Sequence, residues 1–280
     1  MRSCVWAAVA AGVLLTGDIH AKDVTKIAEA SMLVTGTVEL NTDGSVHNYT
    51  LDHQEKLQAA VVDLIQRNVP AWRFTFSSQP TSMPKESMSL RIVAKNIDQQ
   101  HTTLSIAGVQ LDDAAMAGND YVHSVERKPA PVFPSYSLHG GVSGSVYLLV
   151  KVGRDGKVAD IATEQVNLRK EYEQTNMELY RKDLADAAEK AVRQWRFVVP
   201  TTGKWVNEKY WLLRMPVNFH IANTDMDLHS GFDYGTWEVY IPGPRKRVPW
   251  LSDQRLIADA PDMTPDGTTH QLDTAPQLAP

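Results

Sequence analysis

The residues best placed for covalent chemistry surround one serine. Gly141-Val-Ser143-Gly144 follows His139-Gly140, so a hydroxyl lies between glycines with a histidine nearby in the chain. A serine held on a sharp turn in the pattern Gly-x-Ser-x-Gly is typical of a hydrolase nucleophile. This stretch lacks the second spacer residue, and a strand pattern follows it where a helix is required. We interpret the glycines as a turn into a strand, and we expect no catalytic residue and no enzyme.

The sequence also lacks a pattern of residues that is typical of a metal site. The nine histidines are scattered without a His-Glu-x-x-His pair, and Cys4 is the single cysteine. Zinc sites need such pairs or several thiolates. We therefore expect no metal and no cofactor, and a mature chain without a disulfide.

The charge pattern does not indicate a nucleic-acid partner. The formal net charge is -5, whereas nucleic-acid binding relies on basic surface. The basic run Arg245-Lys-Arg247 lies between Pro244 and Pro249. We interpret it as a solvated turn, with weak contact to an anionic surface as the alternative.

The backbone of one strand is the remaining binding candidate. Residues from Trp211 to Ile221 form the closing strand of a repeated unit, and Pro216 inside it cannot donate a ladder hydrogen bond. Pro216 therefore predicts an edge strand whose amide-poor side faces away from its neighbour. An edge offers free backbone groups to an added peptide strand. We expect the peptide-binding edge to use Leu213, Met215, Val217, Phe219 and Ile221.

This strand belongs to a unit that occurs twice in the chain. Residues 32 to 74 and 144 to 197 share one pattern, and superimposing Asp43-Gly44 on Asp155-Gly156 aligns their apolar positions. Val34, Val38, Leu40 and Val46 then coincide with Val146, Val150, Val152 and Val158. A fixed-order repeat divides a chain into units of one fold. The predicted unit is strand, Asp-Gly turn, strand, helix and final strand.

The spacing of apolar residues predicts the helices and the additional strands. A helix is expected from Gln54 to Val69, ended by Pro70, because Leu57, Val61, Leu64 and Ile65 share one face. The second helix has an inner face of Leu184, Ala188, Ala191, Val192 and Trp195, after a polar insertion from Asn167 to Asn176. Met88 to Val93 and Tyr210 to Ile221 are the expected closing strands, and Leu104 to Leu111 is one further strand.

Both copies end in Trp-Arg-Phe. We interpret Trp72, Phe74, Trp195 and Phe197 as core anchors that close the helix over the sheet, with the intervening arginine pointing outward. Asp43, Gly44, Asp155 and Gly156 are the turn residues, because glycine adopts positive φ without a Cβ clash.

The chain of 280 residues divides into five expected segments. Residues 1–21 are an export signal with Arg2, a short apolar stretch and Ala21 near the cut. Residues 22–118 and 129–222 are the two units, 119–128 is a linker, and 223–280 is a proline-rich, partly disordered extension. Within that extension, Phe232 to Ile241 are expected to order against the second unit. An uncleaved signal helix that anchors the chain in the inner membrane is the alternative.

Several motifs resemble the TonB carboxy-terminal domain. They are Pro131-Val-Phe-Pro134, Gly144-x-Val-x-x-x-Val, Asp155-Gly-x-Val158, Ala187-Ala188-x-x-Ala191-Val192-x-x-Trp195-Arg196-Phe197, Gly203 and Met215-Pro-Val-x-Phe219. The first copy looks like a degenerate version of the same domain. The resemblance implies an α+β fold of two units, each a small antiparallel or mixed sheet of about three strands against a helix. In that family the domain grips a short segment of outer-membrane receptors and passes on force from an inner-membrane motor.

The resemblance and the edge strand lead to one main functional expectation. It is an exported, periplasmic, non-enzymatic module that captures a peptide segment of an envelope or outer-membrane protein by strand addition. Because a convincing membrane anchor and a Pro-Glu/Pro-Lys spacer are lacking, the resemblance supports binding more than energy coupling. An anchored energy transducer and a scaffolding protein without a free edge, including self-association, are the alternatives.

Overall fold

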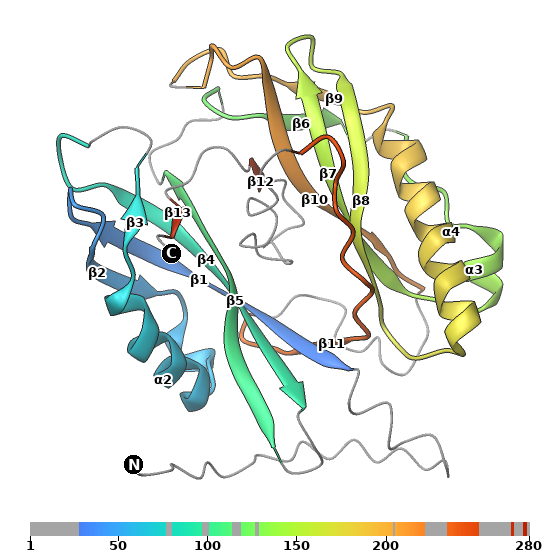
Figure 1. Ribbon diagram of the computed structural model, residues 1–280, viewed down its shortest axis with the longest axis horizontal. Helices are drawn as coiled ribbons and strands as arrows, with labels where there is room; N and C mark the ends of the chain where they lie inside the picture. The colour runs from blue at the N-terminus through green and yellow to red at the C-terminus, as the bar shows by residue number, and fades with distance from the viewer. Residues whose placement is uncertain are drawn as a thin grey trace.

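The computed structural model describes residues 28–76, 80–96, 101–113, 119–126, 129–203, 205–221, 234–251, 270–271 and 277–278. The expected export signal, residues 1–21, lies outside these ranges. Within them, no helix is long and apolar enough to cross a membrane. Antiparallel sheets and a few helices make up the described chain (Figure 1), so the α+β class is confirmed.

The first half of the chain forms one sheet with a helix against it. The long strands are β1 (Glu29–Leu40), β2 (Val46–Leu51), β4 (Lys85–Asn96) and β5 (Thr102–Asp113), in the order β2-β1-β4-β5. Helix α2 (Ala59–Asn68) lies between the 3-10 turns η1 (Gln54–Lys56) and η2 (Val69–Ala71), and β3 (Phe74–Thr75) follows. Residues 29–113 are unit 1. The further strand expected around Leu104 to Leu111 is β5.

The predicted helix from Gln54 to Val69 is shorter in the structure. His53 has a φ of 44°, and Leu57, after η1, is extended with ψ 144°, so the α-helix begins only at Ala59. Its inner face, with Val61 and Ile65 buried, is as expected. Pro70 falls in η2, where a fixed φ suits the first turn of a helix and ends α2 at Asn68.

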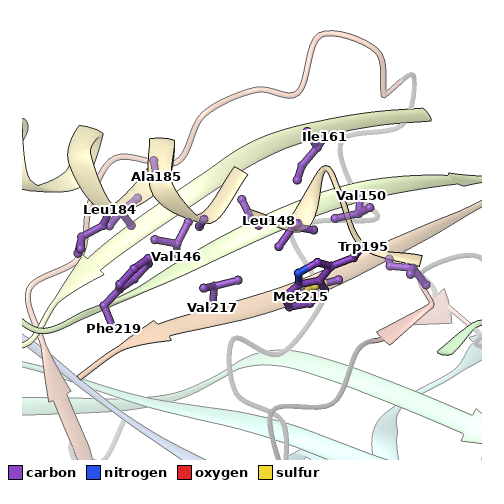
Figure 2. Packing of buried hydrophobic residues seen from close by; sticks show 14 of the residues in the cluster. Val146, Leu148, Val150, Ile161, Leu184, Ala185, Trp195, Met215, Val217 and Phe219 are labelled. Atoms are coloured by element: carbon purple, nitrogen blue, oxygen red, sulfur yellow. The ribbon is translucent and has the colours of Figure 1, made fainter. Parts of the chain in front are cut away.

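The second half repeats this arrangement. It contains α3 (Ser135–His139), β7 (Gly144–Gly153), β8 (Val158–Leu168), α4 (Gln174–Val192), β9 (Arg196–Val198) and β10 (Tyr210–Phe219). These residues, 135–219, are unit 2, and the strands β10, β7 and β8 are neighbours in that order. Figure 2 shows Leu184 and Ala185 of α4 over Val146 and Leu148 of β7, with Val217 and Phe219 of β10 in the same cluster.

The two units agree at their turns as well as in strand order. Gly44 and Gly156 have positive φ, and their carbonyls accept the amides of Phe74 and Phe197 at 2.8 and 2.9 Å. Asp43 Oδ1 accepts the amide of Ser45 at 3.0 Å, and Asp155 Oδ1 accepts that of Lys157 at 3.1 Å. The expected turn residues therefore hold equivalent positions.

The two tryptophans predicted as core anchors differ. Trp195 is 4% exposed and its indole donates to the Pro129 carbonyl at 2.8 Å, whereas Trp72 is only half-buried and packs at the margin of its core. Phe74 and Phe197 are both buried, and Arg73 and Arg196 are exposed as expected. The anchor role of Trp72 is therefore weaker than the repeat suggested.

Segments outside the two units add short strands to them. Within the predicted linker, β6 (His123–Glu126) pairs with β9 of unit 2. Three more strands come from the extension: β11 (Glu238–Tyr240) pairs with β1, β12 (His270–Gln271) with β10, and β13 (Gln277–Leu278) with β3.

The expectation that Phe232 to Ile241 order against the second unit is wrong for most of the described part. Phe232 lies outside the described residues, and Glu238–Tyr240 pair with Glu29–Ser31 of unit 1. Contact with unit 2 comes from Ile241, which exchanges hydrogen bonds with Leu168 at 2.7 and 3.1 Å, and from the side chain of Glu238, which forms an ion pair with Arg169. The segment therefore passes from one unit to the other, which local hydrophobicity does not reveal.

Candidate functional site: the outer edge of β10

The candidate site is the edge of β10 that faces away from β7. On one side β10 pairs with β7 along its whole length, from Tyr210 opposite Gly153 to Phe219 opposite Gly144. On the other side, among the residues that the structure describes, only β12 pairs with it, at Leu213 and Arg214. We call this second side the outer edge.

Hydrogen bonds at both ends of β7 determine which residues of β10 face outward. The Ser143 carbonyl accepts the Arg169 amide at 2.9 Å, and the Gly153 amide donates to Lys157 at 2.9 Å, so odd-numbered residues of β7 direct their backbone groups toward β8. Backbone groups alternate along a strand. Even-numbered residues of β7 therefore face β10, and the register places odd-numbered residues of β10 opposite them.

This alternation corrects the predicted binding edge. The backbone groups of Leu213, Met215, Val217 and Phe219 face β7 and are not free for a partner. The amide of Ile221 follows the same pattern, because it donates to Ser143 Oγ at 3.1 Å. The side chains of Leu213, Met215, Val217 and Phe219 are buried in the core under α4. All five residues therefore serve the fold of unit 2.

The outward backbone groups belong to the even-numbered residues. They are those of Leu212, Arg214, Pro216 and Asn218, and Pro216 contributes only its carbonyl. The prediction that the amide-poor side of Pro216 faces away from its neighbour is thus correct. The same proline was the signal for the right set of residues, because every second residue along a strand shares its direction.

Unit 1 has the same edge, and it is covered. The Leu40 amide donates to the Pro84 carbonyl at 3.0 Å, so even-numbered residues of β4 face β1 and odd-numbered ones face β5. Strand β5 pairs with β4 from Glu86 opposite Asp113 to Asn96 opposite Thr102. Superimposing the β1–β4 and β7–β10 registers places Ser89 of β4 where Pro216 stands in β10. In unit 1 this edge holds an added strand.

A buried ion pair fixes the outer edge from the face opposite α4. Arg214 Nε donates to Glu164 Oε2 at 2.7 Å, and the Arg214 guanidinium lies 4.8 Å from the centre of the Tyr147 ring. Glu164 is an extra residue at a bulge in β8, and its carbonyl accepts the Lys246 amide at 2.8 Å. A small apolar cluster of Leu149, Leu212, Val248 and Leu251 lies on the same face. Sequence periodicity indicated neither the bulge nor the ion pair.

The opposite edge of the unit 2 sheet is largely used by the chain itself. Leu168 at the end of β8 is bonded to Ile241, and the Thr163 amide donates to Glu189 Oε1 at 3.0 Å. Gln165 Nε2 donates to the Gly243 carbonyl at 2.7 Å. Because of these contacts, the β10 edge of this sheet is the better site for an added strand.

The residues considered as a catalytic site or a charged binding site have structural roles. Ser143 Oγ accepts a hydrogen bond from the Ile221 amide. His139 is the last residue of α3, and its Nδ1 lies 2.6 Å from the carbonyl of Ser135, the first residue of that helix. Gly141 has a φ of 61° in the turn before β7. The side chains of Arg245, Lys246 and Arg247 are exposed, and Arg245 lies 3.7 Å from Glu164. Among the described residues, no group of His, Cys, Asp and Glu could hold a metal.

The turn carboxylates have shifted pKa values with a local cause. The pKa of Asp43 is lowered to about 2, first because the Ser45 hydroxyl donates to it at 2.5 Å, then through the Ser45 amide and Arg73. The pKa of Asp155 is also lowered, chiefly by the amide of Lys157. Both carboxylates are therefore charged near neutral pH and stabilise their turns.

Comparison with protein-family models, with curated proteins and with solved structures finds no match to this chain.

Proposed function

We propose that this chain is a non-enzymatic binding module that captures an extended peptide by strand addition to the outer edge of β10. The observation that carries the proposal is the contrast between the units. The equivalent edge of β4 is covered by β5 along its length, whereas in the part of the chain that the structure describes only two residues of β10 are paired there, with β12. The same fold thus already accepts a strand at this edge.

The backbone chemistry of the edge supports reversible binding. Leu212, Arg214 and Asn218 direct an amide and a carbonyl outward, and Pro216 directs a carbonyl only. About five main-chain bonds at roughly 1 kcal/mol each, with two buried side chains, outweigh the ordering of a flexible peptide. The difference corresponds to roughly micromolar affinity. Pro216 limits which registers an added strand adopts, because one donor is missing.

The resemblance of residues 129–222 to the TonB carboxy-terminal domain indicates which kind of protein supplies the peptide. In that family the domain grips a short segment of an outer-membrane receptor. We therefore propose an envelope or outer-membrane protein as the source of the peptide and the periplasm as the location. Energy transduction by an anchored form is the alternative within the same resemblance.

The test is a proline scan that follows the alternation of the edge. Asn218→Pro removes an outward amide from an exposed position, whereas Asn218→Ala keeps that amide and loses only the hydrogen bond from Ser145 at 2.7 Å. Val217→Pro removes a group that faces β7, so it should unfold unit 2. Peptide capture should be lost in the folded Asn218→Pro variant and kept in Asn218→Ala.

The peptide for this test is obtained by crosslinking. A photoreactive residue at Asn218 should trap a partner in cells that the same residue at exposed Leu179 of α4 does not trap. The trapped segment, made as a synthetic peptide, should bind the purified full chain with about micromolar affinity. Equal binding to Asn218→Pro and Asn218→Ala would contradict strand addition.

A scaffolding role without a free edge is the second candidate, and one observation favours it. Residues 234–241 join the units, because β11 pairs with β1 and Ile241 pairs with Leu168. Trp237 Nε1 also donates to Gln58 Oε1 of unit 1 at 3.3 Å. If the crosslinker at Asn218 traps only this chain, the scaffolding role replaces peptide capture.

A further inference from the structure

The two Trp-Arg-Phe strands each accept a short strand in the same register. In unit 2, β6 pairs with β9, placing His123 opposite Val198 and Ser124 opposite Phe197. In unit 1, β13 pairs with β3, placing Gln277 opposite Thr75 and Leu278 opposite Phe74. Both added strands are antiparallel. Residues 277–278 thus occupy in unit 1 the position that the linker segment occupies in unit 2.

Backbone direction agrees at the two positions. The amides of Phe74 and Phe197 donate to Gly44 and Gly156, so these phenylalanines direct their backbone groups toward the turn. By alternation, Thr75 and Val198 direct theirs toward the added strand. The Gln277–Thr75 pair is therefore the hydrogen-bonded pair of β13 and β3, equivalent to the pair of His123 with Val198 in unit 2.

The C-terminal segment also lies on the outer edge of β10. Arg214, whose backbone faces outward, pairs with His270, and Leu213 pairs with Gln271. This pairing is antiparallel, as is that of β5 with the equivalent edge of β4. In Figure 1, β12 lies beside β10 and β13 beside β3. Two short strands of the C-terminal extension therefore contact one acceptor strand in each unit.

We infer that β12 and β13 of the C-terminal extension are intramolecular strand donors, which occupy the outer edge of β10 and the edge of β3 and compete there with an outside peptide. The competition rests on the proposed function, while the occupancy does not. Pairing through two residues at each edge suits a segment that must be displaced. If the segment occupies the edge nine-tenths of the time, an outside peptide binds about tenfold more weakly than to a free edge.

The first test measures occupancy in the full chain without any peptide. His270→Pro with Gln277→Pro removes the two tail amides that face β10 and β3, and Gln271→Pro with Leu278→Pro removes two that point away. Amide hydrogen exchange at Arg214 and Thr75, resolved by NMR, should accelerate about tenfold or more in the first double variant. The second should exchange like the unchanged chain. Equal exchange in all three chains would overturn the inference.

The second test measures competition with a defined probe. A labelled peptide of residues 266–280 should bind the His270→Pro, Gln277→Pro chain about tenfold more tightly than the unchanged chain. Equal affinity would overturn competition by the tail. Protection of Thr75 that rises with protein concentration would assign the strand to a second copy and overturn the intramolecular arrangement. If these tests succeed but the crosslinked envelope peptide does not bind, the proposed function alone fails.

Discussion

Arg214 and Glu164 form an ion pair inside the protein, with 2.7 Å between Nε and Oε2 and side-chain exposures of 3% and 1%. Arg214 belongs to the outer edge of β10 through its backbone, while Glu164, the partner of its side chain, is contacted by Arg245 and Lys246. The ion pair therefore joins the candidate acceptor strand to the bulge of β8. A flexible edge would have to become ordered when a peptide binds, which would weaken the affinity for the peptide. The ion pair avoids this cost because it holds the edge in place.

Breaking this pair should destabilise the protein. Glu164→Gln leaves the buried Arg214 charge without the Glu164 carboxylate, which costs about 3 to 5 kcal/mol in the free energy of unfolding. Arg214→Met should cost less, because Arg245 lies 3.7 Å from Glu164 and remains as a second partner. The exposed pair of Lys182 and Asp186 is the control, and Lys182→Met should cost less than about 1 kcal/mol. Urea unfolding of the three variants measures both values. Losses below about 1 kcal/mol at both buried positions would contradict the role of the pair.

The turn glycines should tolerate no side chain. A Cβ at Gly44 would lie 1.9 Å from the Phe74 carbonyl oxygen, and one at Gly156 would lie 2.3 Å from that of Phe197. Gly44→Ala and Gly156→Ala should each cost at least about 2 kcal/mol, because positive φ and a backbone clash add together. Gly141→Ala is the matched control, with a φ of +61° but its nearest atom 3.9 Å away. Equal losses of stability at all three glycines would show that positive φ alone, and not the backbone clash, determines the cost.

Acid should affect the first turn through Asp43. Its folded pKa is about 2, below the usual 3.8, so the charged form stabilises the fold above about pH 4. That contribution is lost as the pH falls toward 2. An NMR titration of the Asp43 carboxyl should give a midpoint near 2. Ser45→Ala should raise that midpoint and leave Asp155 unchanged, because Asp155 depends on Lys157. An unchanged Asp43 midpoint would contradict the hydroxyl as the main cause.

The two tryptophans should differ in their contribution to stability. Trp195→Ala removes a buried aromatic ring and an indole hydrogen bond, and should cost about 3 to 5 kcal/mol. Trp72→Ala should cost less, because that ring is half-buried and contacts Phe74 edge-on at 6.1 Å between centroids. Chemical denaturation, followed by far-ultraviolet circular dichroism to report the whole fold, compares them. A larger loss at Trp72 would contradict the burial difference.

Local patterns predicted much of each unit. Alternation marked the long strands, the Asp-Gly pairs marked the turns, and helical spacing marked the inner face of α4 around Leu184 and Ala188. These features depend on neighbours in the chain, so a sequence records them directly. The duplication then placed equivalent residues in equivalent positions.

The parts that sequence patterns did not predict depend on distant pairings. Strands β6, β12 and β13 are each two to four residues long, which is too short for a period to appear. The course of Glu238–Tyr240 along β1 likewise depends on partners far along the chain. The side of β10 that faces outward was implied by Pro216, yet the predicted edge consisted of the odd-numbered residues, whose backbone groups face β7.

The central claim is that the outer edge of β10, apart from the two residues paired with β12, is open to an added strand. Amide hydrogen exchange along β10 tests this claim most directly. In the full chain without a partner, the amides of Leu213, Met215 and Val217 should exchange slowly, because they face β7. Those of Leu212 and Asn218 should exchange at least about tenfold faster, with Arg214 between them because of β12. Uniformly slow exchange from Leu212 to Asn218 would mean that the edge is already paired and would contradict strand addition.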